Sequence, residues 1–263
     1  MNSCGAVHKK KALVTGASSG LGRETALELA REGAEVALGF SGNEAGAVSA
    51  AAEIERIGGR AHVIRADLSV ASEAKRLADD AAALMGGLEI LVNNAGITKT
   101  KRFFEMTEED YDKSFDLNMR GIFFCAQAAA KHMAKSGGGS IVNMSSTHAM
   151  ASLPGYSVYA STKGAIVSFT KQLAVELARK GIRVNCIVPG CILVDRNFSN
   201  NPETDAAIIA ESIPSGTIGT PSDIAKTIVF LASGAASYVN GAVIVADGGL
   251  LCKNAIVTPE ASD

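Results

Sequence analysis

Residues 15–22 read Thr-Gly-Ala-Ser-Ser-Gly-Leu-Gly and carry the clearest indication of the fold. They follow an apolar run at 12–14 and open an amphipathic pattern over 21–32, so the glycines lie in a turn between a buried strand and a helix. Glycines there allow backbone to approach a pyrophosphate closely, and the helix N-terminus supplies free N–H groups and the positive end of a dipole. The stretch therefore predicts a dinucleotide-binding turn, with the spacing Gly-x-x-x-Gly-x-Gly rather than Gly-x-Gly-x-x-Gly.

Short apolar runs alternate with longer amphipathic stretches along the rest of the chain. Buried strands are predicted at 12–14, 36–38, 62–64, 90–92, 141–143, 184–188 and 243–245. Helices are predicted over 21–32, 44–57, 72–84, 107–135, 156–179 and 222–231. This alternation predicts an α/β fold, a Rossmann-type doubly wound parallel sheet of about seven strands with helices on both faces. Ligands of such sheets bind at the carboxyl ends of the strands.

The chain shows no internal repeat or low-complexity linker, so residues 1–263 are expected to form a single dinucleotide-binding domain. Residues 1–9 are expected to be a flexible N-terminus. Residues 191–220 contain two prolines and two glycines and show little periodicity. This segment is predicted to be a lid on the substrate side, with an ordinary surface excursion as the alternative.

The composition argues against several classes of partner. Charged residues make up 20% of the 263, and the formal net charge is −2, so neither nucleic acid nor a membrane surface is expected as a partner. The sequence contains no uninterrupted run of about 18 apolar residues, so no transmembrane helix is predicted. The five cysteines include no Cys-x-x-Cys pair, so no metal site or disulfide framework is predicted. The N-terminal residues lack the apolar core of a secretory signal, and a cytoplasmic protein is expected.

Tyr159 and Lys163 are four residues apart in a predicted helix, which places their side chains on one face, one turn apart. An ammonium held near a phenol favours the phenolate and lowers the pKa of the phenol. Such a tyrosine can exchange a proton with a carbonyl or alcohol oxygen near neutral pH. Tyr156 has Ala160 at the corresponding position, so Tyr159 is the candidate catalytic residue.

Polar residues also follow two other predicted strands. Asn93-Asn94-Ala95-Gly96 follows the fourth strand, where small residues and amides can line an adenosine pocket or brace the sheet. Asp67 and Leu68 follow the third strand. The carboxylate of Asp67 can accept a hydrogen bond from an adenine amino group or cap the next helix.

Together these motifs resemble the short-chain dehydrogenase/reductase family. The resemblance covers about residues 10–249 and rests on residues 16–22, Asn93 to Gly96, Ser146 thirteen residues before Tyr159, Lys163, Pro189-Gly190 and Asp247-Gly248-Gly249. It implies an NAD(P)(H)-dependent oxidoreductase that transfers a hydride between nicotinamide and a carbonyl or secondary alcohol. It also implies a homotetramer that buries the predicted helices 107–135 and 156–179 between subunits. Core burial within one subunit would explain the apolar faces of these helices as well.

The resemblance implies a role for each of four residues. Tyr159 would be the general acid in reduction and the base in oxidation, and Lys163 would lower the pKa of that phenol and hold the nicotinamide ribose. Ser146 would hydrogen-bond the substrate oxygen, whereas its neighbour Ser145 is expected to be structural. Asn118, in Asp-Leu-Asn-Met-Arg, would position a proton-relay water.

The implied cofactor site gathers residues from all of these motifs: Gly16, Ser18, Ser19, Gly20, Leu21, Gly22, Ser41, Asp67, Leu68, Asn94, Ala95, Gly96, Tyr159, Lys163, Pro189, Gly190 and Ile192. Family members often carry a threonine where this chain has Val194, and backbone contacts from Ile192 are expected to substitute. The second strand ends in Leu-Gly-Phe-Ser without the acidic residue that would bind the 2′-hydroxyl of NAD. NADP(H) is therefore favoured over NAD(H), with Ser41 as a hydrogen-bond donor, although no arginine or lysine follows that strand.

Two classes of small-molecule substrate remain open. The stretch 40–44 and the chain length resemble 3-oxoacyl-[acyl-carrier-protein] reductases, which implies a substrate presented by an acidic acyl carrier. Residues 148–150 and 153–156 resemble sugar or polyol dehydrogenases of the same family. His148 either faces the substrate pocket or is a hydrogen-bonded structural histidine. A dinucleotide-sensing regulator without turnover is a remote alternative, because such proteins typically lose the tyrosine or the lysine.

Overall fold

The computed structural model describes residues 5–194 and 202–253 of the chain. Seven strands form one parallel sheet in the order β3-β2-β1-β4-β5-β6-β7, which confirms the predicted fold class. Their bounds are β1 Lys11–Thr15, β2 Glu35–Phe40, β3 Arg60–Arg65, β4 Ile90–Asn93, β5 Gly139–Met144, β6 Ile182–Pro189 and β7 Val243–Ala246. The strand order changes direction between β1 and β4, and this switch point creates the crevice in which such sheets bind ligands.

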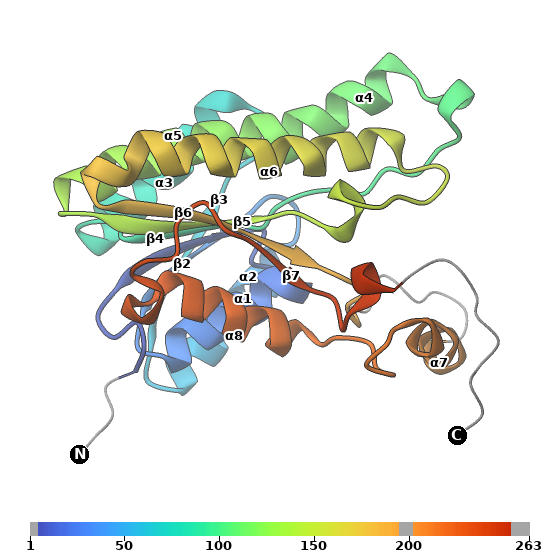
Figure 1. Ribbon diagram of the computed structural model, residues 1–263. Helices are drawn as coiled ribbons and strands as arrows, with labels where there is room; N and C mark the ends of the chain where they lie inside the picture. The colour runs from blue at the N-terminus through green and yellow to red at the C-terminus, as the bar shows by residue number, and fades with distance from the viewer. Residues whose placement is uncertain (1–4, 195–201, 254–263) are drawn as a thin grey trace.

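Helices cover both faces of the sheet (Figure 1). One layer consists of α3 Ala71–Met85, α4 Glu108–Phe115, α5 Ile122–Lys135 and α6 Ser157–Leu177, and the other of α1 Gly20–Arg31, α2 Glu44–Arg56 and α8 Pro221–Ala232. Successive residues Leu13 and Val14 are both fully buried, one in the core under each layer. Burial on both faces explains why the strands read as continuous apolar runs rather than as alternating ones.

The predicted helix over 107–135 is interrupted in the structure. A π-helical segment, η2 (Asp116–Gly121), separates α4 from α5 and carries the fully buried Asn118. Gly121 comes so close to the turn before α3 that a Cβ on it would lie 2.6 Å from the carbonyl oxygen of Leu68. Apolar periodicity alone does not distinguish a π-helical turn from an α-helical one, so the sequence predicted one continuous helix.

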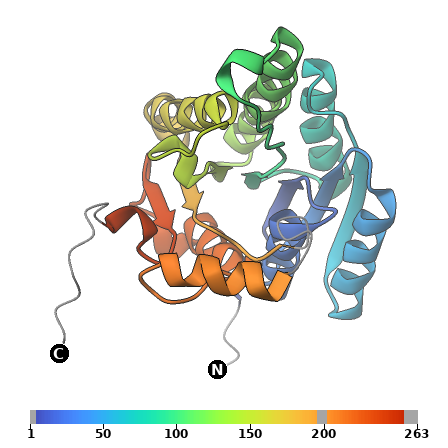
Figure 2. The ribbon, with the colours of Figure 1, turned by 90° about the vertical axis from the view of Figure 1, so that its right-hand side faces the viewer.

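The predicted lid, residues 191–220, is described in part. Residues 195–201 lie outside the described residues, and the helix α7 (Pro202–Ser212), which the sequence did not predict, follows them. Ile192 pairs with Gly219, and the N–H of Leu193 donates to the carbonyl of Gly219 at 2.8 Å, so the two ends of the segment meet. In Figure 2, where the right-hand side of Figure 1 faces the viewer, α7 (orange) lies at the front, below the ends of β6 and β7.

The predicted flexible N-terminus, residues 1–9, is also described in part, since residues 1–4 lie outside the described residues. Residues 5–9 form turns against α1, and Val7 is buried with its N–H donating to the carbonyl of Glu32 at 3.3 Å. Within 5–194 and 202–253, no helix is long and apolar enough to span a membrane.

Candidate active site

A crevice of about 530 Å³ opens where β1, β4, β5 and β6 end. It is lined by Gly16, 18–22, 94–98, 144–146, Tyr159, Lys163, Pro189, Gly190, 192–194 and Pro221. Every residue predicted to hold the cofactor lines it except Ser41, Asp67 and Leu68. Of the predicted catalytic residues, Ser146, Tyr159 and Lys163 line it and Asn118 does not.

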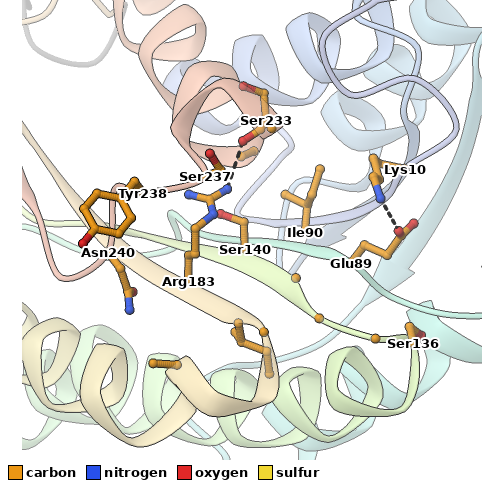
Figure 3. A pocket seen from close by; sticks show the side chains of 18 residues that line it. Lys10, Glu89, Ile90, Ser136, Ser140, Arg183, Ser233, Ser237, Tyr238 and Asn240 are labelled. Carbon is orange, nitrogen blue, oxygen red and sulfur yellow. Dashed lines mark hydrogen bonds and ion pairs between the residues drawn. The ribbon is translucent and has the colours of Figure 1, made fainter.

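A second cavity, of about 710 Å³, lies at the opposite edge, where β4, β5 and β6 begin (Figure 3). Its charged side chains already have protein partners. Arg183 donates to the carbonyls of Val239 and Ser233 at 3.3 and 3.1 Å, and Lys10 pairs with Glu89 at 2.7 Å. None of the predicted site residues lines this cavity, so the smaller crevice is the candidate site.

The glycine-rich turn forms one wall of the crevice. Gly16 and Gly20 have φ values of +66° and +54°, which favour glycine over residues with a side chain. A Cβ on Gly22 would lie 2.2 Å from the carbonyl oxygen of Gly16, so only glycine allows α1 to start so close to β1. The helix begins without a side-chain cap and has no acidic residue in its first turn. Its first amides are therefore suited to an anion, and the turn fits a dinucleotide pyrophosphate.

Asn94 braces this turn against β4. Its Nδ2 donates to the carbonyl oxygens of Thr15 and Gly16 at 2.9 and 3.2 Å. The hydroxyl of Thr15 in turn accepts from the N–H groups of Asn94 and Ala95, each at 3.0 Å. The sequence left open whether this segment lines an adenosine pocket or braces the sheet. The hydrogen bonds of Asn94 brace the sheet, and the residue also lines the crevice.

Asp67 is engaged in a turn before α3. Its Oδ1 accepts from the N–H and the hydroxyl of Ser69 at 3.0 and 2.7 Å. This is an Asx-type turn that precedes α3 and does not cap it, because the N-cap of that helix is Val70 and makes no side-chain capping hydrogen bond.

Tyr159 and Lys163 project from α6 into the crevice, one helical turn apart. Lys163 is only 4% exposed, and its ammonium donates to the carbonyl of Met144 at 2.9 Å and lies 5.6 Å from the centroid of the Tyr159 ring. The buried hydroxyl of Ser145 donates to the carbonyl of Lys163 at 2.8 Å, which ties the end of β5 to α6. Ser145 thus has the structural contact expected of it, while Ser146 lines the crevice beside Tyr159.

Asn118 lies behind the crevice wall and joins three segments. Its Oδ1 accepts from the N–H of Ile97 at 2.8 Å, and its Nδ2 donates to the carbonyl of Ile97 at 2.9 Å and to the hydroxyl of Thr162 at 3.2 Å. The Thr162 hydroxyl donates to the carbonyl of Tyr159 at 2.7 Å. The amide therefore connects η2 and the loop after β4 to α6, the helix that carries Tyr159 and Lys163.

Arg65 is a candidate cofactor residue that the sequence argument missed. It ends β3 in register with Phe40, the last residue of β2, so a cation lies on the strand beside the turn that begins at Ser41. Arg65 is exposed, and its carbonyl oxygen accepts a hydrogen bond from the guanidinium of Arg76 at 2.7 Å. The sequence argument considered only residues that follow β2 along the chain, whereas Arg65 is brought there by strand pairing.

Over residues 5–194 and 202–253, no group of three or more His, Cys, Asp and Glu side chains is arranged to hold a metal ion. Burial alone raises the pKa of the Cys125 thiol to about 12. Burial is also the largest cause that raises the pKa of the Cys186 thiol to about 11. Both thiols are therefore protonated near neutral pH and act as core residues.

Comparison with known proteins places this geometry among dehydrogenases and reductases. A family model described as enoyl-(acyl carrier protein) reductase matches residues 16–251. The 3-oxoacyl-[acyl-carrier-protein] reductase FabG of Staphylococcus aureus is 38% identical over 241 residues, which cover 92% of this chain and 98% of that protein. The L-rhamnose 1-dehydrogenase (NAD(P)(+)) of Azotobacter vinelandii is 39% identical over 246 residues, covering 92% and 96%.

The solved structures include a short-chain dehydrogenase from Burkholderia cenocepacia in complex with NADP. It superposes with a TM-score of 0.87 at 33% identity and covers 94% of this chain and 99% of its own.

Proposed function

This chain belongs to the short-chain dehydrogenase/reductase family of oxidoreductases, and from that premise we propose that it is an NADP(H)-dependent reductase of 3-oxoacyl thioesters. The observation that carries the proposal is the shared crevice. The glycine-rich turn, Ser146, Tyr159 and Lys163 all line one hollow at the carboxyl edge of the sheet. A dinucleotide turn and a proton-transfer pair in one crevice are what hydride transfer to a carbonyl requires.

In this proposal the bound cofactor supplies the hydride, and the protein supplies geometry and protons. The first-turn amides of α1 bind the pyrophosphate, and Lys163 binds the nicotinamide ribose. Tyr159 donates a proton to the substrate oxygen, which also accepts a hydrogen bond from Ser146. These two hydroxyls stabilise the negative charge that develops on that oxygen.

The preference for NADP(H) rests on the turn after β2. Gly42 has open space around it, Ser41 is exposed, and none of the three residues directly after Phe40 carries a carboxylate that would repel a 2′-phosphate; the first acidic residue is Glu44, in the first turn of α2. Arg65, at the end of the neighbouring strand, is the cation that we propose for that phosphate.

The choice of an acyl substrate rests on exposed apolar residues in the loops at the carboxyl edge of the sheet, of which Ile97 and Leu193 line the crevice. The loops after β4, β5 and β6, which are adjacent in the sheet, expose Ile97, Met150, Leu153 and Leu193. Exposed apolar side chains on neighbouring loops suit a hydrocarbon chain. Oxidation of a sugar or polyol is the second candidate, because the polar imidazole of His148 packs beside Tyr159.

A kinetic screen separates these candidates. NADPH and NADH oxidation is measured with short and long 3-oxoacyl thioesters, and NADP⁺ and NAD⁺ reduction with sugars and polyols. The proposal expects the highest kcat/KM for a thioester with NADPH, and faster turnover of a sugar would replace it by the second candidate. Cofactor binding without turnover of any compound would favour the regulator, and Tyr159→Phe serves as the inactive control.

A further inference from the structure

Three aromatic rings meet beside the crevice. The rings of His148 and Tyr156 stack with their centroids 4.1 Å apart and their planes at 17°. Both rings meet Tyr159 edge-on, at 5.6 Å and 75° for His148 and at 6.2 Å and 66° for Tyr156. Edge-to-face geometry at these distances is favourable and directional, so the stacked pair constrains the plane of the Tyr159 ring.

His148 also contacts Ser146, the other residue proposed to hydrogen-bond the substrate oxygen. Its backbone N–H donates to the hydroxyl oxygen of Ser146 at 3.2 Å, two residues away in the chain. One residue therefore touches both Ser146, through its backbone, and Tyr159, through its ring.

The imidazole of His148 is in ring contact with Tyr156 and Tyr159. Its Nδ1 is buried without a hydrogen-bond partner in the described part of the chain, so this nitrogen does not provide the hydrogen bond that the structural alternative for His148 needs. Burial lowers the pKa of His148, so the ring is neutral near pH 7.

The backbone of this region is itself held in place. The N–H of Lys101, in the loop after β4, donates to the carbonyl of Gly155 at 2.9 Å, directly before Tyr156. The hydroxyl of Ser152 donates to the carbonyl of His148 at 3.1 Å. The stacked rings therefore project from a segment fixed at both ends.

We propose that His148 and Tyr156 are positioning residues, a stacked pair that orients the phenol of Tyr159 toward the substrate oxygen bound by Ser146. The pair acts through Tyr159 and needs no contact with substrate. This inference rests on the proposed oxidoreductase function. Because a displacement of about 1 Å at a reacting group can lower a rate by about a hundredfold, loss of the pair should reduce kcat.

The test compares ring-removing with ring-retaining variants. His148→Ala and Tyr156→Ala should lower kcat about tenfold to a hundredfold while KM and the Kd for NADPH change little, since the cofactor wall is untouched. His148→Phe and Tyr156→Phe keep the rings and should restore most of the lost kcat. Tyr111→Ala is the matched control, because it removes another stacked ring, 4.4 Å from Phe115 on α4 and outside the crevice.

Full activity of both alanine variants, or equal loss in the alanine and phenylalanine variants, would overturn the proposal. The kinetics use whichever compound the unmodified protein turns over fastest, so they do not depend on the substrate class. If the unmodified protein reduces none of the compounds, the proposed function fails. The positioning role is then tested without turnover, by the chemical shift of the ¹³Cζ NMR signal of Tyr159. That signal should move in His148→Ala and not in Tyr111→Ala, and an unmoved signal would contradict the positioning role.

Discussion

At the scale of the residue, Lys163 is proposed to have two roles, lowering the pKa of the Tyr159 phenol and binding the nicotinamide ribose, whereas Tyr159 is proposed to transfer a proton. Its ammonium lies near the phenol and is fixed by the carbonyl of Met144, at 2.9 Å, in a buried position. Tyr159→Phe should lower kcat by about 10²–10⁴-fold, the usual contribution of a general acid, and leave the Kd for NADPH nearly unchanged. Lys163→Ala should lower kcat and weaken NADPH binding together. Steady-state kinetics and fluorescence titration of NADPH measure both, and an unaltered Kd in Lys163→Ala would contradict the ribose contact.

Arg65 is proposed to pair with the 2′-phosphate of NADP(H), which predicts a change in the KM for NADPH when the arginine is removed. Removing a cation that pairs with the 2′-phosphate should raise KM for NADPH about tenfold and leave KM for NADH unchanged, since a charge-assisted hydrogen bond contributes about 1.5 kcal/mol or more. Arg65→Ala tests this, with Arg60→Ala as the control at the opposite end of the same strand. Equal effects on the two cofactors would remove Arg65 from the proposal.

At the scale of the element, η2 depends on Asn118. The fully buried amide makes three hydrogen bonds to Ile97 and Thr162, so Asn118→Ala removes these partners from the part-buried backbone groups of Ile97 and from the buried hydroxyl of Thr162. The free energy of unfolding should fall by about 1–3 kcal/mol, measured by urea denaturation. Gln127→Ala, at an exposed position of the adjoining α5, should change it little. Unaltered stability in Asn118→Ala would show that η2 does not need the amide.

The loop after β4 is held to α4 by one carboxylate. Asp110 lies in a capping box with Thr107 and accepts from Lys101 at 2.8 Å and from Lys99 at 3.1 Å. Hydrogen bonds from Lys101, Lys99 and Thr107 hold the pKa of Asp110 well below its usual value.

The pH dependence of stability follows from this direction. Because the folded state prefers the ionised carboxylate, the stabilisation is complete above about pH 4, the ordinary pKa of aspartate, and declines as the pH falls toward the lower folded-state pKa. Asp110→Asn should therefore lower the melting temperature most at pH 7, and the difference from the unmodified protein should shrink below pH 4. A difference that grows on acidification would contradict the assignment.

At the scale of the whole molecule, the outer face of the α5–α6 layer exposes apolar side chains among its polar ones. Phe123 is 41% exposed and stacks on Phe169 of α6 at 5.2 Å, and Val175 is 77% exposed, whereas Ile122 and Ile166 belong to the core. Since the resemblance implies a homotetramer, we expect this face to be covered by another subunit. Phe123→Glu should therefore lower the mass measured by light scattering. Val48→Glu, on α2 in the opposite layer, should not, and an unchanged mass in Phe123→Glu would exclude this face.

Local patterns account for most of what could be predicted. The seven strands and six of the helical regions follow from apolar periodicity, and the turn at 15–22 follows from its glycines, because these signals depend on neighbours within a few residues. The same is true of Tyr159 and Lys163, whose spacing on one helix places both side chains in the crevice.

The remaining features depend on contacts between distant parts of the chain. The π-helical turn around Asn118 is associated with hydrogen bonds to Ile97 and Thr162, and Arg65 lies beside the second strand only through pairing. The stacking of His148 on Tyr156 likewise requires the segment before α6 to fold back. Chain-local chemistry thus determined the architecture and the placement of Tyr159 and Lys163 on one face of one helix. Tertiary packing established what surrounds that pair, because side-chain neighbours and strand register are properties of the folded molecule and leave no periodic mark along the chain.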